Sequence, residues 1–388
     1  MTAHSLDRKE FLALFTAVLG TACTRTKPGS ESVSTATPAA DGSRAAFSER
    51  LLEDVARTFA VTLAFLGDQL GLFAALARSG PCAAADLARS TALHPRLVRE
   101  WLDGMVAAGY VSYASEEKRY HLPGDRASAL VDETAPDFAA GMINLAIPLV
   151  MASHSVIESF RSGRPVTPDV FHADLWRGIE RYSAPAYRHR LVQHWLPSLP
   201  AVVTTLQEGG TFVDVGCGSG HAAIAIAKAF PNARVSGFDP YAPAIERARQ
   251  NAAAADLATR VAFHVGSARD LPAGTIDVMT TFDVAHHYAD PVSELAAVRR
   301  ALTKDGSYLL FDAAISEHVE QNANPWGVFI YGTSVLYCLH DSLANNGAGI
   351  GADFSEPRVR DLASRAGFRH ARRVDLDDAT VALYELKL

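Results

Sequence analysis

Residues 211–220 read Thr-Phe-Val-Asp-Val-Gly-Cys-Gly-Ser-Gly, and this stretch decides the fold. Its first half predicts a short β-strand, Gly216, Gly218 and Gly220 predict a tight turn, and Ala222 to Phe230 predict a helix. Glycine permits positive φ angles and lets a ligand approach the backbone, while the start of a helix offers unpaired N–H groups. The stretch therefore predicts the entry to a nucleotide-binding βαβ unit.

The residues that follow extend this unit into a sheet. A predicted strand ends in Asp239, which lies 19 residues beyond Gly220, close to the ~20 residues expected for a carboxylate that binds ribose hydroxyls. Further strands alternate with helices, and each candidate ligand falls at the carboxyl end of a strand. The sequence predicts an α/β, Rossmann-like, mostly parallel sheet. The remaining predicted strands are Val261–Gly266, Thr275–Phe282, Gly306–Phe311 and Ala379–Leu386.

Two families share such a glycine turn. The run from Gly218 to Ala223 fits a dinucleotide fingerprint, but Asp214 lies inside the strand, where a dinucleotide fold keeps apolar residues. Asp-Val-Gly-Cys-Gly-Ser-Gly instead resembles motif I of the class I S-adenosylmethionine-dependent methyltransferases. The resemblance implies that Asp214 and the three glycines hold the methionine part of S-adenosyl-L-methionine and that Asp239 holds its ribose. The alternative role for Asp214 is that of a capping or turn residue.

The same resemblance suggests where the adenine lies. Methyltransferases commonly place an Asp after the third strand to receive the adenine amino group, and this chain has Ser267-Ala268 there. Ser267 and Ala268 are therefore the expected contacts, with Asp270 as an alternative three residues further on. Phe282, at the end of the fourth strand, completes the predicted cofactor-binding set.

The segment after the fourth strand supplies a candidate catalytic base. Ala285-His-His-Tyr-Ala-Asp290 resembles the Leu-His-Asp-Trp-Ser-Asp type motif of small-molecule O-methyltransferases, whose His is the base. The resemblance assigns this role to His286, and a neutral imidazole with an ordinary pKa of about 6.5 suits it. The alternative is a hydrogen-bonded loop residue beside the cofactor. His287, which replaces the motif's Asp, is expected to be structural or solvent-facing.

Other polar residues are weaker candidates for the same site. Asp312 and Glu317 follow the fifth strand and could steady the base. Four residues fall in the segment that usually forms the substrate lid. Each of them is equally well explained as a packing residue or as a substrate contact. These residues are Trp326, Tyr331, His340 and Asn345.

The region before the glycine turn is helical. Apolar residues recur at three- and four-residue steps from Leu51 to Phe73, which predicts a helical stretch. Two short helices and a β-hairpin follow, and together they predict a winged helix with the hairpin as its wing. On the helix that would be the recognition helix, Glu100 and Asp103 offset Arg96 and Arg99, and the whole chain carries a formal charge of −7. Because DNA binding needs an excess of cations, we expect no nucleic-acid partner. The winged helix is expected to form a homodimer.

These patterns divide the chain into four predicted parts. Residues 1–46 form a leader or linker, 47–135 a winged-helix dimerisation domain, 136–200 a helical connector or substrate lid, and 201–388 the methyltransferase domain. Within the connector, an apolar helical stretch at 138–152 is expected to be broken by Asn144 and Pro148. Methyltransferases with an N-terminal winged-helix domain resemble the chain from residue 47 onward.

The leader leaves the location of the protein open. Arg8 and Lys9 precede an apolar stretch that ends at Cys23, which resembles a lipoprotein export signal, whereas the predicted function favours the cytoplasm. No run of 18 apolar residues occurs, so no ordinary membrane span is predicted. The four cysteines lack metal-ligand or redox spacing, so neither a metal site nor a disulfide framework is predicted.

The sequence therefore predicts a metal-independent methyltransferase that acts on a hydroxyl of a small, aromatic or polyketide-like molecule. Methylation at carbon or nitrogen on the same scaffold is the nearest alternative. A winged-helix regulator that senses S-adenosylmethionine and an NAD-dependent enzyme are the alternatives from other classes.

Overall fold

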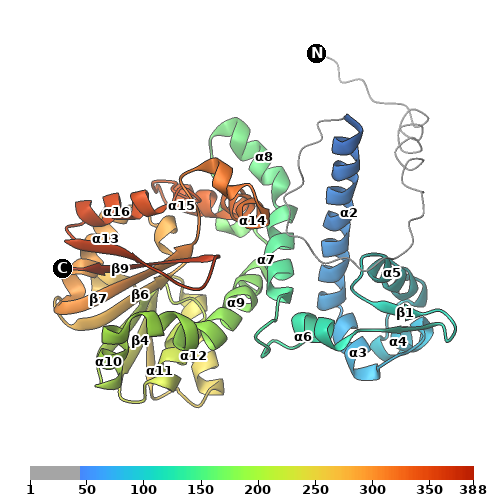
Figure 1. Cartoon of the computed structure of the whole chain (residues 1–388), viewed down its shortest axis with the longest axis horizontal. Coiled ribbons are helices and arrows are strands. Elements are labelled where there is room, and N and C mark those ends of the chain that lie inside the picture. The colour runs from blue at the N-terminus through green and yellow to red at the C-terminus, as the bar shows by residue number, and fades with distance from the viewer. Residues whose placement is uncertain (1–43) are drawn as a thin grey trace.

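A seven-stranded sheet forms the centre of the C-terminal half in the computed structural model, which describes residues 44–388 (Figure 1). The strand order is β5-β4-β3-β6-β7-β9-β8, and β9 pairs antiparallel with both β7 and β8 in an otherwise parallel sheet. From β3 the chain moves outward through β4 and β5 and then returns to β6. This reversal creates a switch point between β3 and β6, where open α/β sheets bind ligands.

The observed strands lie close to the predicted ones, except for the edge strand β8, which was not predicted. The strand bounds are β3 Thr211–Val215, β4 Arg234–Asp239, β5 Val261–Val265, β6 Ile276–Phe282, β7 Leu302–Ala313, β8 His370–Val374 and β9 Val381–Lys387. The alternation of strands and helices is confirmed, and β9 is the antiparallel last strand in the chain. Strand β8 was not predicted, because only Val374 of its five residues is buried and the strand carries no alternating apolar pattern.

Helices cover both faces of the sheet (Figure 1). One apolar cluster joins α10, α11 and α12 to one face, and a second joins α13 and α16 to the other. The carboxyl ends of the strands, where the predicted ligands lie, are left to the connecting segments. The helix bounds are α10 Pro200–Gln207, α11 His221–Ala229, α12 Ala242–Ala254, α13 Pro291–Ala301 and α16 Glu356–Arg365.

The N-terminal part has the predicted helix-turn-helix and two-stranded wing. The periodic stretch from Leu51 to Phe73 is two helices rather than one, because Gly71 adopts a left-handed conformation between α2 and α3. Arg96 and Arg99 form ion pairs with Glu100 and Asp103, as the charge pattern suggested. The elements are α2 Arg44–Gln69, α3 Leu72–Ser79, α4 Ala84–Thr91, α5 Pro95–Ala107, β1 Ser112–Ala114, β2 Arg119–His121 and α6 Gly124–Val131.

The connector is anchored by two helices in close contact, α7 (Ala140–Met151) and α9 (Asp174–Ala186). A Cβ atom added at Gly141 or Gly178 would collide with the backbone of the facing helix, so these glycines permit the approach. The break predicted at Asn144 and Pro148 is wrong: α7 runs through both residues, and Asn144 is buried and accepts a hydrogen bond from Arg181 (2.6 Å). Arg181 also pairs with Asp68 of α2 (2.7 Å), which joins the connector to the N-terminal domain.

Most of the predicted leader, including Cys23, lies outside the described residues. Within residues 44–388, no single helix is long and apolar enough to cross a membrane, although two sharply bent helix pairs meet the length and composition criteria jointly. These pairs are α2 with α3, and α7 with α8 (Ser153–Ser162).

Candidate functional site

The glycine turn has the geometry that a bound ligand would need. Gly216, Gly218 and Gly220 have φ angles of 72°, 51° and 79°, a region that favours glycine. Gly220 caps the N-terminus of α11. A Cβ atom at Gly216 would lie 2.5 Å from a methyl group of Val284. The absence of a side chain therefore brings the turn directly against the segment that carries His286.

Asp239 ties the end of β4 to this turn. Its carboxylate accepts hydrogen bonds from the backbone N–H groups of Gly218 (2.9 Å) and Tyr241 (2.8 Å). Burial raises the pKa of Asp239, and the two N–H donors act in the opposite direction. A carboxylate has about four lone-pair positions, so two remain for the ribose hydroxyls that the sequence assigned to this residue.

Asp214 lies deeper than its neighbours, with 2% of its surface exposed. Its carboxyl group accepts a hydrogen bond from the hydroxyl of Thr280 in β6 (2.9 Å). Burial raises the pKa of Asp214 to about 7, and the charge of Asp239 adds to the rise while Thr280 opposes it. The side chain thus bridges the two strands at the switch point.

The predicted adenine segment forms a small capping box. Ser267 Oγ accepts a hydrogen bond from the backbone N–H of Arg269 (3.2 Å), and Asp270 accepts one from the N–H of Ser267 (2.8 Å). Ala268 is fully buried, and Phe282 stacks on Phe311 with ring centroids 4.5 Å apart. The side chains of Ala268 and Phe282 therefore pack into the core. Only the backbone atoms of these two residues are left to contact a cofactor.

His286 follows β6 in a short 3₁₀ turn, Ala285–His287, and is buried against the end of β7. Its Nδ1 lies 2.9 Å from a carboxylate oxygen of Asp312. Burial lowers the pKa of His286, but the charge and hydrogen bond of Asp312, with a contribution from Asp283, raise it above the ordinary value. Of the two acids considered, the structure brings Asp312 to His286, whereas Glu317 is exposed and pairs with His318.

Asp283 lies in the electrostatic neighbourhood of Asp312 and His286 and was not among the residues predicted from the sequence. It has a φ of 54°, a strained conformation for a non-glycine residue, and such strain concentrates at functional sites. Its side chain is exposed, yet the surrounding protein and the charge of Asp312 raise its pKa, against the effect of His286. Its position directly after β6, between Phe282 and His286, was the signal available in the sequence.

His287 proves to be part of a second, adjoining cluster. Its Nδ1 lies 2.8 Å from Asp341, at the start of α15 (Leu339–Ala344). Its ring centroid is 4.2 Å from that of His286. Cys338 lies close enough that one potential ligand atom from each of these three residues falls within 4.8 Å of the others. Because Cys338 is about 50 residues from the histidines, no local spacing could reveal the cluster.

The four lid candidates all make contacts within the protein. Trp326 donates to the carbonyl of Ala314, Tyr331 accepts from Asn322, and Asn345 donates to the carbonyl of Asp341. His340 is buried and accepts from the backbone N–H of Val166 (3.3 Å). These contacts support the packing reading of each residue.

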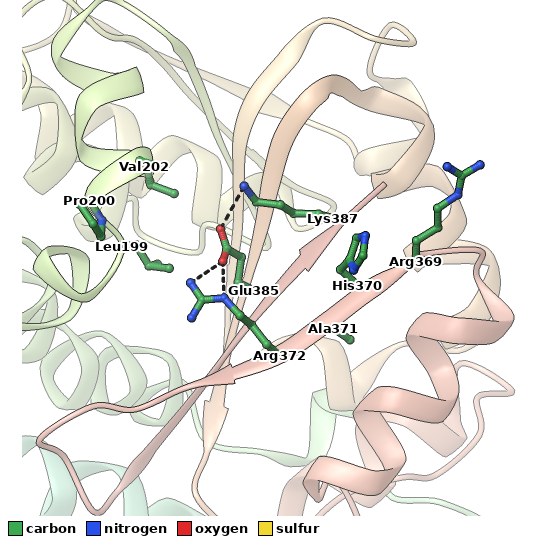
Figure 2. Close-up of a pocket in the computed structure, with 10 residues that line it drawn as sticks. Leu199, Pro200, Val202, Arg369, His370, Ala371, Arg372, Glu385 and Lys387 are labelled. Atoms are coloured by element: carbon green, nitrogen blue, oxygen red, sulfur yellow. Dashed lines mark hydrogen bonds and ion pairs between the residues drawn. The ribbon is translucent and has the colours of Figure 1, made fainter.

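A groove of about 660 Å³ lies beside the last two strands of the sheet, β8 and β9 (Figure 2). It is lined by α10, β8 and the end of β9, and Glu385 on its floor is paired with Arg372 and Lys387. Leu386 of β9 pairs with Tyr308 in the middle of β7, whereas Asp312, the partner of His286, lies four residues further along that strand. No residue with a predicted role is among those that line the groove.

The fold and the site together define a class of protein. The family described as "Methyltransferase domain" matches residues 206–366, and the "Rv2258c-like winged HTH domain" matches residues 58–132. The chain contains a class I S-adenosylmethionine-dependent methyltransferase domain preceded by a winged-helix domain.

Individual relatives agree with this class. The polyketide 8-O-methyltransferase TcmO of Streptomyces glaucescens is 25% identical over 278 residues, which cover 66% of this chain and 78% of that protein. A ribosomal protein L11 methyltransferase of Burkholderia thailandensis is 28% identical over 163 residues, 42% of this chain and about half (49%) of the relative. The solved structure of CalO1, a methyltransferase in calicheamicin biosynthesis in its SAH-bound form, aligns with a TM-score of 0.65 at 21% identity, over 90% of this chain and all (100%) of that one.

Proposed function

We propose that the protein transfers a methyl group from S-adenosyl-L-methionine to a hydroxyl group of a small molecule, with His286 as the general base. The pairing of His286 Nδ1 with Asp312 carries this proposal. If Nδ1–H donates to the carboxylate, the Nε2 lone pair is free to accept a proton. The O-methyltransferase TcmO, which aligns over most of its length, supports a hydroxyl acceptor.

The residues present fit the cofactor. The glycine turn offers backbone N–H groups at the start of α11, and Asp239 has lone pairs left for the ribose. The bound cofactor supplies an electrophilic methyl group on a sulfonium. The turn, Asp239 and Asp214 would hold it, Ser267 and Ala268 would border its adenine, and Phe282 would contribute backbone to the cofactor site at the end of β6.

Within this arrangement the chain does two things for the reaction. It aligns the acceptor with the methyl group, which can contribute ~7–11 kcal/mol, and it removes the proton, which typically contributes ~10²–10⁴-fold. As the acceptor oxygen takes the methyl group that the cofactor would supply, its hydroxyl proton would pass to Nε2 of His286. Asp312 stabilises the resulting imidazolium.

The test compares wild type with His286→Gln. Turnover of a phenolic acceptor should fall by ~10²–10⁴-fold, while the affinity for S-adenosylmethionine in calorimetry stays the same. The loss should shrink as the pH approaches the pKa of the phenol, because the acceptor then arrives ionised. A variant within threefold of wild type from about pH 6 to 9 would remove the general-base role and leave alignment alone.

Acceptor panels distinguish the alternatives. Amines and activated carbons should be poor substrates, and a rate that follows the ionisation of an amine would favour N-methylation. Binding of genomic DNA fragments in a mobility-shift assay would favour a regulator, which the ion-paired Arg96 and Arg99 argue against.

A further inference from the structure

His286, His287 and Cys338 form a compact group of two imidazoles and one thiol. One potential ligand atom from each lies within 4.8 Å of the others. Zinc–nitrogen bonds are about 2.0–2.1 Å and zinc–sulfur bonds about 2.3 Å, so tetrahedral ligand atoms stand roughly 3.3–3.6 Å apart. Shifts on the order of 1 Å would close the group around an ion of this size.

The surroundings of both histidines are those of metal ligands. Histidines that bind zinc almost always donate their second ring N–H to a carboxylate or carbonyl group, which fixes the ring and leaves the other nitrogen for the metal. Here Asp312 lies 2.9 Å from Nδ1 of His286, and Asp341 lies 2.8 Å from Nδ1 of His287. Both imidazoles are thus held by carboxylates beside one thiol, which is the arrangement of histidine ligands around a metal ion.

The backbone around the cluster supports the same conclusion. Cys338 ends a short π-helical segment, Ser334–Cys338, between α14 (Pro325–Thr333) and α15. Such π segments occur frequently at functional sites. Cys338 is buried, forms no disulfide and hydrogen-bonds to His287, and a soft metal ion would replace the proton of this thiol.

We propose that His286, His287 and Cys338 bind a thiophilic divalent cation, with Zn²⁺ as the fitting ion, and that this ion inhibits the enzyme. Three protein ligands leave a fourth position open to water. Inhibition rests on the proposed function, because Nε2 of His286 has one lone pair and cannot serve both the metal and the acceptor proton. Metal binding itself rests only on the geometry.

The first experiment measures binding without any substrate. Chelator-treated full-length protein is titrated with Co²⁺, whose visible and thiolate charge-transfer absorption reports the ligands, and Zn²⁺ then displaces the cobalt. Cys338→Ser should lose the charge-transfer band and weaken Zn²⁺ binding more than tenfold, and His287→Gln should weaken binding similarly. Cys82→Ser, which removes a buried thiol in the winged-helix domain, should bind as wild type does. Absence of Co²⁺ and Zn²⁺ binding at micromolar protein, or unchanged binding in both ligand variants, overturns the site.

The second experiment measures inhibition. With chelator present, methyl transfer tests the proposed function alone. Added Zn²⁺ should then abolish wild-type turnover at the concentration that saturates the cluster, and excess chelator should restore it. Full turnover in the zinc-bound protein would overturn the inhibition and would also count against His286 as the base, while the spectroscopic result would stand separately.

Discussion

At the scale of single residues, Asp239 serves two neighbours at once. Its carboxylate accepts hydrogen bonds from Gly218 in the glycine turn and from Tyr241 at the start of the next helix. Fixing the turn and holding a ribose are compatible tasks for one carboxylate, because its lone pairs exceed the donors that the protein supplies.

Replacing this carboxylate should weaken cofactor binding. A charge-assisted hydrogen bond is worth ~1.5–3 kcal/mol, so Asp239→Ala should raise the dissociation constant of S-adenosylmethionine by roughly tenfold to a hundredfold in calorimetry. Asp270→Ala is the comparison, since Asp270 caps the turn at Ser267, and we expect its effect to be less than threefold. An unchanged constant in Asp239→Ala would remove Asp239 from the site, and a large loss in Asp270→Ala would assign the adenine contact to Asp270.

Asp312 should control the pH dependence of the reaction. Burial lowers the pKa of His286, but Asp312, together with the smaller effects of Asp283 and Asp341, more than offsets this, so the base becomes neutral only above its ordinary pKa. In Asp312→Asn the pKa of His286 should fall, and the acidic limb of the pH–rate profile should move to lower pH. Turnover at alkaline pH should drop by roughly tenfold to a hundredfold as the ring loses its charged partner. A limb that stays in place would show that Asp312 only packs against the ring.

At the scale of elements, the sequence predicts what local pattern controls. The glycine turn, β3, β4 and the position of His286 after β6 all follow from spacing and periodicity. The sequence left two acids, Asp312 and Glu317, as possible partners of His286. It could not choose between them, because the contact depends on how β6 and β7 pair in the sheet. Cys338 and Asp341 could not be predicted, because they come to the histidines from a segment about 50 residues away in the sequence. The helix break predicted at Asn144 is wrong, because Arg181 of the facing helix α9 donates a hydrogen bond to the Asn144 side chain.

The contact between α7 and α9 should be sensitive to a single methyl group. A Cβ atom at Gly178 would collide with the carbonyl group of Asn144, so Gly178→Ala should lower the free energy of unfolding by ~1–3 kcal/mol in chemical denaturation. Gly332→Ala in α14 is the matched control, since nothing lies within 4 Å of an added Cβ there, and it should be neutral or stabilising by up to ~1 kcal/mol. Equal stability of the two variants would contradict the close packing.

At the scale of the whole molecule, α2 and the connector link the two ends of the chain. Arg181 of α9, only 8% exposed, pairs with Asp68 of α2 and with Glu133, so the N-terminal domain is attached to the connector by buried charge. Removing one partner from a buried pair leaves an uncompensated charge and is costly. The winged-helix domain is therefore held against the helices that border the catalytic domain.

The remaining surface of α2 points to a second copy of the chain. Figure 1 shows the N-terminal half of this helix extending away from α3, α4 and α5. Five apolar side chains on one face of α2, and Leu70 directly after its end, are 43–68% exposed, which is an unusual concentration for a lone domain. They are Phe47, Leu51, Val55, Phe59, Leu66 and Leu70.

We therefore expect residues 47–388 to form a homodimer through this face of α2. Size-exclusion chromatography with light scattering should give twice the monomer mass at micromolar concentration. The double variant Leu51→Glu/Phe59→Glu should give the monomer mass, because two charges would be buried at the interface. Arg57→Glu, which at 100° per residue lies on the opposite side of the helix, should remain dimeric. A wild-type monomer at micromolar concentration, or a double variant that still dimerises, would mean that this apolar face serves another contact.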